Sequence, residues 1–509
     1  MTESRTVKTL RNVRVSFVFC IFGLVANFFA RRIFIDVLGA ELMGLNTTAS
    51  NLLGFLNLAE LGISGAIAAL LYKPIFEKDR AAISEIISVQ GWFYRRVTLC
   101  VCVGAALLLP FFPLIFAKAD VPLVYAYLTF GVLFVNSLLG YLFNYKQILL
   151  TADQKDYKVI LNLNGFRLAK TGLQIAAVAF LAHGYLWWIG LEAAMGVAAV
   201  WALSRVIRRE YPWLEANVAA GGELRKKHPE ILRKTKQVFF HKIGGFALFQ
   251  ASPLVIYAFT DLTTVAVYGS YLMCFAGIGA IFNSAFNGVT AGFGNLISEG
   301  DGERVGAVYW EFTSARYWLA SIICFACARL ATPFVGLWIG SDYVLDDAAF
   351  ALLLAYYFIQ FTRTNDTFLS AYGLFRDVWA PLAEAAINLG SSVALGFFWG
   401  LPGVLAGILL SQLVIIVIWK PYFLFKYGLR VPFRVYLRKR GALLAACAFS
   451  AGASLFATNA VFETPTDTWF SWVFSAVKIS SIYGIVSFAV FTAAFPAFRR
   501  VVFRFVPRK

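Results

Sequence analysis

The sequence predicts an all-α integral membrane protein of about fourteen transmembrane helices. We expect two six-helix lobes related by a pseudo-twofold axis along the membrane normal, plus two C-terminal helices. Three observations predict this class: a very apolar composition, apolar runs that recur along the whole chain, and basic residues confined to alternate loops. A partial internal repeat indicates the arrangement in lobes.

The composition excludes an ordinary soluble enzyme. Hydrophobic residues make up 60% of the 509 positions and charged residues 14%, and the mean hydropathy is +0.71, whereas soluble domains carry about a quarter charged residues. The formal net charge is +17, but the Lys and Arg residues lie in short loops between apolar runs, so we expect no nucleic-acid partner. The seven cysteines all lie in apolar segments and are interpreted as small buried hydrophobes, with no metal site.

Apolar runs long enough to cross about 30 Å of hydrocarbon occur throughout the chain. The first follows a basic N-terminal segment without a small-residue cleavage site, so it is interpreted as a retained span. The predicted spans are 13–32, 45–71, 97–117, 121–145, 158–182, 185–206, 237–259, 264–296, 315–339, 348–372, 377–399, 402–425, 441–461 and 469–495.

The distribution of basic residues supports this count, because cytoplasmic loops are rich in Lys and Arg. Loops after even-numbered spans are basic, whereas the intervening loops, such as GSDYVLDD and NAVFETPTDTW, carry almost no Lys or Arg. The basic residues of the even loops include Lys73, Lys78, Arg80, Arg95, Arg96, Lys146, Lys155, Arg304, Arg376, Lys426, Arg430, Arg434, Arg438, Lys439 and Arg440. We therefore expect an even number of spans with both termini cytoplasmic.

One long polar stretch divides the chain. It spans residues 207–236 and is interpreted as a solvated linker that contacts anionic lipid. The predicted organisation is an N-terminal lobe at residues 1–206, a cytoplasmic linker at 207–236, a C-terminal lobe at 237–425, and the last two helices with a basic cytoplasmic tail at 426–509.

Two echoes indicate that the lobes are copies of one six-helix bundle. The segment that begins MGLNTTASNLLG at Met43 resembles the segment that begins YGSYLMCFAGIG at Tyr268, and Lys155 with Asp156 resembles Arg376 with Asp377. Both offsets are about 220 to 225 residues. Copies of an even number of spans insert the same way up, and such bundles expose a cavity alternately to either side. The alternative is a chance likeness between small-residue helices.

Several of these segments resemble one known family. LNLAELGISGAIAALLYKPI at 56–75, VAVYGSYL at 265–272, GFGNLISEGD at 292–301, YGLFRDVWAPLAEAAINLGSS at 372–392 and GLPGVLAGILLSQLV at 400–414 resemble segments of polysaccharide-transporter flippases, in the expected order. These flippases belong to the multidrug, oligosaccharidyl-lipid and polysaccharide exporter superfamily.

The resemblance implies both a location and a substrate. It implies a multi-pass protein of the bacterial cytoplasmic membrane that exports undecaprenyl-pyrophosphate-linked oligosaccharide repeat units for a surface polysaccharide such as O-antigen. The implied partners are that lipid-linked oligosaccharide, membrane lipids, and the polysaccharide polymerase and chain-length machinery. No cofactor is implied, although a proton or sodium gradient is a candidate energy source.

A pyrophosphate that enters the membrane needs fixed cations, and Arg suits phosphate because its planar fork donates two hydrogen bonds. A charge at mid-bilayer costs at least about 2.5 kcal/mol, so intramembrane charges indicate a sheltered site. Arg167 and Lys170 in the fifth span, and Arg363 in the tenth, are the first candidates for substrate binding. The further candidates are Arg31, Arg32 and Arg329, with Asn27, Asn283 and Asn287 as sugar contacts. The alternative for each charge is snorkelling or a structural ion pair.

Two carboxylates are candidates for ion coupling. Glu60 in the second span is interpreted as the one acidic residue well inside the first lobe, and it either binds a coupling ion or pairs with Arg31 or Arg32. Asp366 either takes part in coupling or neutralises Arg363. The glycine pair Gly403 and Gly407, like Gly288 and Gly292, predicts a close helix contact.

Other function classes remain as alternatives. A membrane polysaccharide polymerase needs a catalytic constellation, but the external loops are short and the chain has three histidines. A Walker A loop is absent from the sequence, which disfavours direct ATP hydrolysis. We therefore expect a transporter and not an enzyme. The closest alternative is another exporter of the same superfamily, for a drug or a peptidoglycan lipid precursor.

Overall fold

The computed structural model describes residues 5–60, 62–232, 235, 251–290, 293–374, 377, 379–461 and 467–505. The regular elements of these residues are helices, and nine of the described helical segments are long and apolar enough to span a membrane. The predicted all-α membrane class is thus confirmed. The chain forms two compact units, Met1–Gly269 and Ser270–Lys509.

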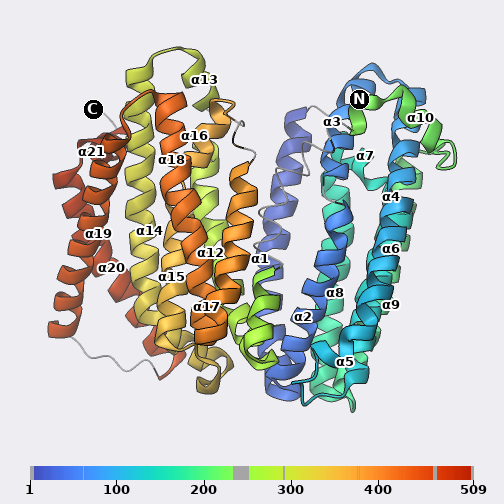
Figure 1. Ribbon diagram of the computed structural model, residues 1–509, viewed down its shortest axis with the longest axis horizontal. Helices are drawn as coiled ribbons and strands as arrows, with labels where there is room; N and C mark the ends of the chain where they lie inside the picture. The colour runs from blue at the N-terminus through green and yellow to red at the C-terminus, as the bar shows by residue number, and fades with distance from the viewer. Residues whose placement is uncertain are drawn as a thin grey trace. The chain divides into compact units, whose positions relative to one another are not determined.

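Unit 1 is a bundle of long helices that run side by side (Figure 1). Its helices are α1 (Arg5–Leu38), α2 (Ala40–Leu56), η1 (Asn57–Glu60), α3 (Ile63–Glu77), α4 (Arg80–Leu108), η2 (Leu109–Phe111), α5 (Phe112–Ile115), α6 (Leu123–Phe143), α7 (Gln147–Ala152), α8 (Asp156–Phe180), α9 (Gly184–Glu210) and α10 (Gly221–Lys227). The boundary between the units falls inside α12 (Leu262–Thr290).

Unit 2 is also built of long helices with short breaks. Its remaining elements are α13 (Phe293–Ser298), α14 (Gly302–Ile339), η3 (Ser341–Tyr343), α15 (Asp347–Phe361), α16 (Asn365–Ala371), α17 (Trp379–Gln412), η4 (Leu413–Trp419), α18 (Lys420–Leu424), η5 (Phe425–Leu429), α19 (Phe433–Val461), α20 (Trp469–Ala494) and α21 (Pro496–Phe505). The predicted lobe boundaries at 206 and 237 stay a prediction, and most of the seventh predicted span lies outside the described residues.

Two helices extend well beyond the apolar run that predicted them. α4 begins at Arg80 because the Asp79 side chain accepts a hydrogen bond from the Ala82 amide at 2.9 Å. α14 begins in the same way, with the Asp301 carboxylate capping the Arg304 amide at 3.0 Å. An aspartate cap pairs backbone amides that no earlier helical turn can satisfy. The helix therefore starts outside the apolar run, which hydropathy alone does not detect.

The second predicted span is broken. α2 ends in the short 3-10 turn η1, and Gly62, with φ of 93°, starts α3 in a left-handed conformation that favours glycine. Gly400 splits α17 similarly, with φ of 56°. Its two halves correspond to the eleventh and twelfth predicted spans.

The two halves of α17 lie backbone to backbone. A Cβ added at Gly403 would lie 2.0 Å from the carbonyl oxygen of Leu395, and one at Gly407 would lie 2.4 Å from the amide nitrogen of Ser392. The predicted close contact at this glycine pair is confirmed. Gly292, of the second predicted pair, lies outside the described residues.

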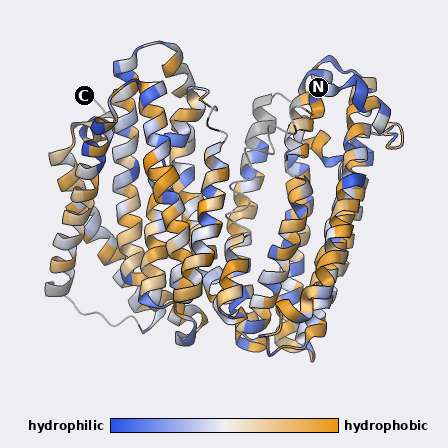
Figure 2. Cartoon of the chain, viewed as in Figure 1, coloured by the Kyte–Doolittle hydropathy of each residue, from blue (hydrophilic) through white to orange (hydrophobic). Residues whose placement is uncertain are grey.

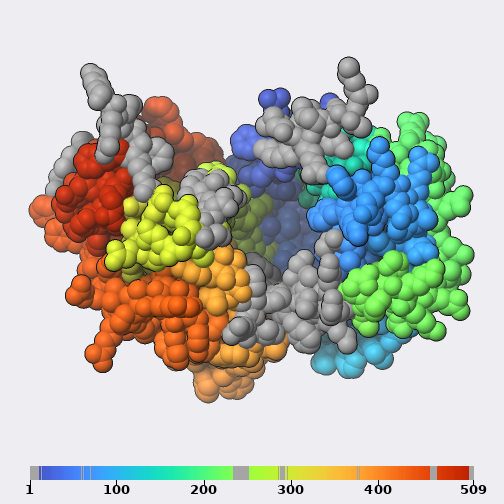
Figure 3. All heavy atoms as spheres, turned by 90° about the horizontal axis from the view of Figure 1, so that it is seen from above, coloured from blue at the N-terminus to red at the C-terminus, as the bar shows by residue number. Residues whose placement is uncertain are grey.

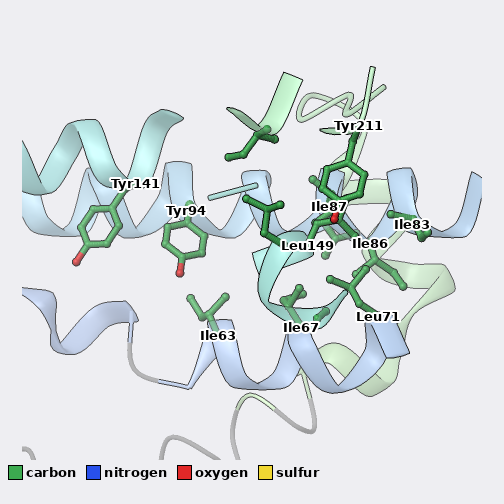
Figure 4. Packing of buried hydrophobic residues seen from close by; sticks show 14 of the residues in the cluster. Ile63, Ile67, Leu71, Ile83, Ile86, Ile87, Tyr94, Tyr141, Leu149 and Tyr211 are labelled. Carbon is green, nitrogen blue, oxygen red and sulfur yellow. The ribbon is translucent and has the colours of Figure 1, made fainter. Parts of the chain in front are cut away.

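The core of unit 1 lies where α3, α4 and α7 meet. Ile63, Ile67 and Leu71 project from one face of α3 toward Ile87 of α4 and Leu149 of α7 (Figure 4). The i, i+4, i+8 spacing puts the three α3 side chains on one stripe. This packing fixes the position of the helical break that carries Glu60.

Apolar side chains also cover much of the outer surface. Phe180 and Phe470 are each 85% exposed, and Figure 2 shows orange residues along the shafts of the helices and blue residues around the α3–α4 turn and α10. Such large exposed hydrophobic side chains are expected where lipid is the solvent.

In unit 1, a cluster of ion pairs joins the α7–α8 turn to the end of α9. Lys155 Nζ lies 2.8 Å from Asp153 and 3.2 Å from Glu210, which also pairs with Lys158. The Tyr211 hydroxyl donates to Asp153 at 2.9 Å. Burial lowers the pKa of Lys155, but the hydrogen bonds to Asp153 and Glu210 outweigh it, and the pKa is raised above its ordinary value.

Candidate functional site

The strongest charged cluster of unit 2 joins three elements through one carboxylate. Arg363 lies in the turn between α15 and α16, Asp366 in the first turn of α16, and Lys420 at the start of α18. Asp366 accepts hydrogen bonds from Arg363 Nε and from Lys420 Nζ, the latter at 2.7 Å. The three side chains are 28%, 29% and 16% exposed. Two cations on one carboxylate give these three side chains a formal charge of +1, before the Glu384 carboxylate described below is counted.

A line of amides extends this cluster into α17. The Gln360 amide lies 3.4 Å from Arg363 and donates to Gln412 at 2.9 Å, and Gln412 donates to Glu384 at 2.7 Å. Gln412 and Glu384 are buried. The path brings together both halves of α17, which the turn at Gly400 folds against each other.

The backbone around Lys420 is unusual. Lys420 and α18 lie between two π-helical segments, η4 and η5. π-Helical turns are rare and occur frequently at functional sites. An ammonium group carries three N–H donors, and within the described chain Lys420 uses one of them, on Asp366. The cluster therefore keeps N–H donors that can form hydrogen bonds with an anionic group.

Arg316 of α14 is a second buried cation of unit 2, with a structural role. Its Nε donates to the Phe361 carbonyl at 2.9 Å, and its guanidinium lies over the rings of Phe282 and Phe286 at 5.1 and 5.2 Å. Cation–π contacts of this kind stabilise a desolvated guanidinium. Its Nε thus bonds to α15, and its guanidinium packs against the rings of α12.

In unit 1, Lys170 of α8 is paired with Glu192 of α9. Its Nζ lies 2.7 Å from each carboxylate oxygen, and Gln174 of α8 lies 3.4 Å from the same group. The interpretation of Glu60 as the one acidic residue well inside the first lobe is therefore wrong, because Glu192 also lies several residues inside a predicted span. Lys170 is a neutralised cation, which is the structural alternative given for it above.

Arg167 differs from its neighbour. It lies on α8 three residues before Lys170 and is exposed, and its side chain has no hydrogen bond or ion pair with the described residues. It keeps all five guanidinium donors for another group. Its role as a substrate contact stays a prediction.

The two arginines near the end of α1 have different partners. Arg31 donates to the backbone carbonyl of Ala266, and Arg32 lies 3.5 Å from Asp36, one turn further along α1. Asn27 is exposed on the same helix. The contact of Arg31 ties α1 to the first turns of α12 within unit 1.

Glu60 has hydroxyl partners. Its Oε1 accepts from the Tyr94 hydroxyl at 2.7 Å and from Ser64 at 3.2 Å, and these two hydroxyls lie 2.6 Å apart. The expected alternative of a pair with Arg31 or Arg32 is wrong, because the described contacts of Glu60 are with hydroxyls. The carboxylate belongs to the last residue of the 3-10 turn η1, between α2 and α3.

The other candidates are dispersed in unit 2. Arg329 is exposed on α14, and Asn283 is exposed on α12. The side chain of Asn287 lies outside the described residues. Of the predicted site residues, the structure brings Arg363 and Asp366 together and leaves Arg329 and Asn283 apart from their cluster.

The sequence prediction missed Lys420, Glu384 and Glu192. Each lies several residues inside a predicted span, as do the charges that were selected. Ranking every intramembrane charge, acidic as well as basic, would have found them. Gln360 and Gln412 carry no comparable signal, because a single amide in an apolar run is common between packed helices.

The sequence matches no protein-family model, and no curated protein matches it. Solved structures do share its fold. The Lipid II flippase MurJ, in an inward closed conformation, aligns with a TM-score of 0.65 and 13% identity over 97% of this chain and 100% of its own. An inward-facing multidrug resistance MATE family transporter of the MOP superfamily aligns with a TM-score of 0.59 and 14% identity over 80% of this chain and 95% of its own. The protein thus has the multi-pass membrane fold of these two solved structures.

Proposed function

We propose that the protein is a flippase that moves undecaprenyl-pyrophosphate-linked oligosaccharide repeat units across the bacterial cytoplasmic membrane by alternating access. The observation that carries the proposal is the cluster of Arg363, Asp366 and Lys420, whose two cations and unused N–H donors suit a pyrophosphate. A charged group within the membrane is costly, so two cations in one mostly buried cluster need a functional reason.

The two similar structures favour a lipid substrate over a drug. The likeness to the Lipid II flippase extends over 97% of this chain, whereas the likeness to the multidrug transporter extends over 80%. A multidrug exporter of cationic compounds would gain nothing from excess positive charge at its site. In unit 1, Arg167 is an exposed cation of α8 whose donors have no partner among the described residues.

Energy for transport would come from an ion gradient. Glu60, held by Tyr94 and Ser64 in a helical break, is our candidate for the coupling ion in unit 1. Asp366 is engaged by two cations, so its structural role as their counter-ion is favoured over coupling.

A second candidate is the flipping of a peptidoglycan lipid precursor, which the likeness to the Lipid II flippase favours. Both substrates carry a pyrophosphate, and they differ in the attached sugar. The cation cluster fits either, so only the accumulated intermediate distinguishes them.

The test is deletion of the gene with analysis of lipid-linked intermediates. A flippase predicts repeat units stranded on the cytoplasmic leaflet, a polymerase defect would leave single units already exported, and accumulation of peptidoglycan precursors would favour the second candidate. Complementation with Arg167→Ala, Arg363→Ala or Lys420→Gln should restore export poorly at normal protein levels. Lys226→Ala, which removes an exposed cation of α10, is the matched control. Full export by Arg363→Ala and Lys420→Gln would overturn the site in unit 2, and full export by Arg167→Ala would remove Arg167 from the candidates.

A further inference from the structure

Unit 2 holds a cavity that is separate from the Arg363 cluster. It has a volume of about 1030 Å³ and lies among the first turns of α14, the start of α19 and the α20–α21 turn. α14 and α21 pack against each other, and Figure 3 looks onto the face where the start of α14, in yellow, lies beside α21, in red. The positive-inside pattern predicts that this face is cytoplasmic.

The charges of the cavity are layered. Asp301 and Glu303 line it where α14 begins. Lys439 and Arg500 line it deeper: Lys439 Nζ lies 4.8 Å from the centre of the Trp310 ring, and Arg500 pairs with Glu311, the next residue of α14. Seven helical residues separate Glu303 from Trp310, which is about 10 Å along the axis. An acidic layer thus lies nearer the aqueous face and a basic layer nearer the membrane.

Both layers have capacity for a ligand. Among the described residues, Lys439 has no ion-pair partner. The exposed Glu303 carboxylate likewise accepts no hydrogen bond from any described residue. Asp301 uses one carboxylate oxygen for the helix cap, and Arg500 uses its Nε on Glu311 at 2.7 Å. One carboxylate oxygen of Asp301 and the two terminal nitrogens of Arg500 are therefore left to contact a ligand.

The wall is otherwise apolar. Leu443 of α19 and Phe495 at the α20–α21 turn line it, together with Gly306, at which an added Cβ would meet nothing within 4 Å. The glycine leaves open space beside the charged layers. A molecule that fills the cavity therefore needs a cationic end, an anionic group next to it and an apolar part.

We propose that this cavity binds a phospholipid of the adjacent leaflet with a primary-amine headgroup, of the phosphatidylethanolamine type. Its ammonium group would contact Asp301 and Glu303, its phosphate would contact Lys439 and Arg500, and its chains would follow the apolar wall. In a leaflet the amine lies outside the phosphate, which is the order of the two charged layers. Phosphatidylglycerol would place the same phosphate against the basic layer but only neutral hydroxyls against the two carboxylates, and a choline headgroup has no N–H to donate to them.

The test is native mass spectrometry of the full purified chain with phosphatidylethanolamine, phosphatidylcholine and phosphatidylglycerol of identical acyl chains in competition. The wild type should retain phosphatidylethanolamine over both others. Glu303→Gln should reduce that preference by about tenfold, which corresponds to the loss of one charge-assisted hydrogen bond. Glu303→Lys should turn the preference toward phosphatidylglycerol. Equal retention of the three lipids by the wild type, or an unchanged preference in Glu303→Lys, would overturn the proposal.

Two further variants separate the site from general effects. Gly306→Leu should fill the cavity and abolish selective retention with an unchanged melting temperature, because the added side chain enters open space. Glu223→Lys makes the same charge change on exposed α10 of unit 1 and should keep the preference of the wild type. Selective retention by Gly306→Leu would also overturn the proposal. The readout is lipid binding, so it does not depend on the transported substrate.

Discussion

Asp366→Asn is the most informative single substitution, because it removes the one carboxylate that holds two intramembrane cations. Lys420 Nζ lies 2.7 Å from Asp366, which corresponds to about 6 kcal/mol of attraction at an effective dielectric of 20, before desolvation is subtracted. Removal of one partner of a buried ion pair costs about 3 to 5 kcal/mol, because the remaining charge is uncompensated. We expect the free energy of unfolding to fall by an amount in this range, since the three side chains are mostly buried. The formal charge of the cluster rises from +1 to +2.

The assay is unfolding of the purified chain in mixed micelles with SDS. Asp342→Asn, an exposed carboxylate of η3, is the control and should unfold like the wild type. Lys420→Met added to Asp366→Asn returns the cluster to +1 and should recover at least about 1 kcal/mol, as expected for residues in direct contact. If Asp366→Asn unfolds like Asp342→Asn, or if the second substitution destabilises further, the reasoning is refuted.

Further predictions concern the helix contacts and unit 1. Gly407→Val should prevent the halves of α17 from packing and lower the yield of folded protein, whereas Gly390→Ala, with open space around its Cβ, should not; equal yields would contradict the contact. Tyr94→Phe should cost about 0.6 to 1 kcal/mol in the same unfolding assay, because it removes the hydroxyl that donates to Glu60; a free energy of unfolding equal to that of the wild type would contradict the contact. Lys155→Gln should be less stable than the wild type at neutral pH. The difference in free energy of unfolding should disappear as the pH rises above about 10.5, because a raised lysine pKa contributes stability that is lost on deprotonation. A difference that persists would contradict the ion cluster.

The sequence predicted the fold class because a membrane imposes a simple rule. Each crossing needs a long apolar run with its backbone groups paired in a helix, and charge is confined to the ends. Local composition therefore reveals the spans without knowledge of their partners. The helix extensions capped by Asp79 and Asp301 were not predicted, since they depend on hydrogen bonds outside the membrane.

Close backbone contact was also predictable, because glycine spacing has one main structural use in such helices. Gly403 and Gly407 were selected from the sequence, and they lie against Leu395 and Ser392 as expected. The turn at Gly400 that makes this contact was placed between two predicted spans.

The partners of the charges were decided by the tertiary structure alone. Arg167 and Lys170 differ by three residues and have the same charge, yet one is exposed and the other faces Glu192 across a helix pair. Depth along a helix can be counted from the sequence, but the direction of a side chain and the residue opposite it depend on packing between segments far apart in the chain. For that reason the sequence by itself determined the membrane class, the spans and a list of costly charges. The fold decided which of those charges are neutralised, as Lys170 is, and which join Lys420 in a cluster around Asp366.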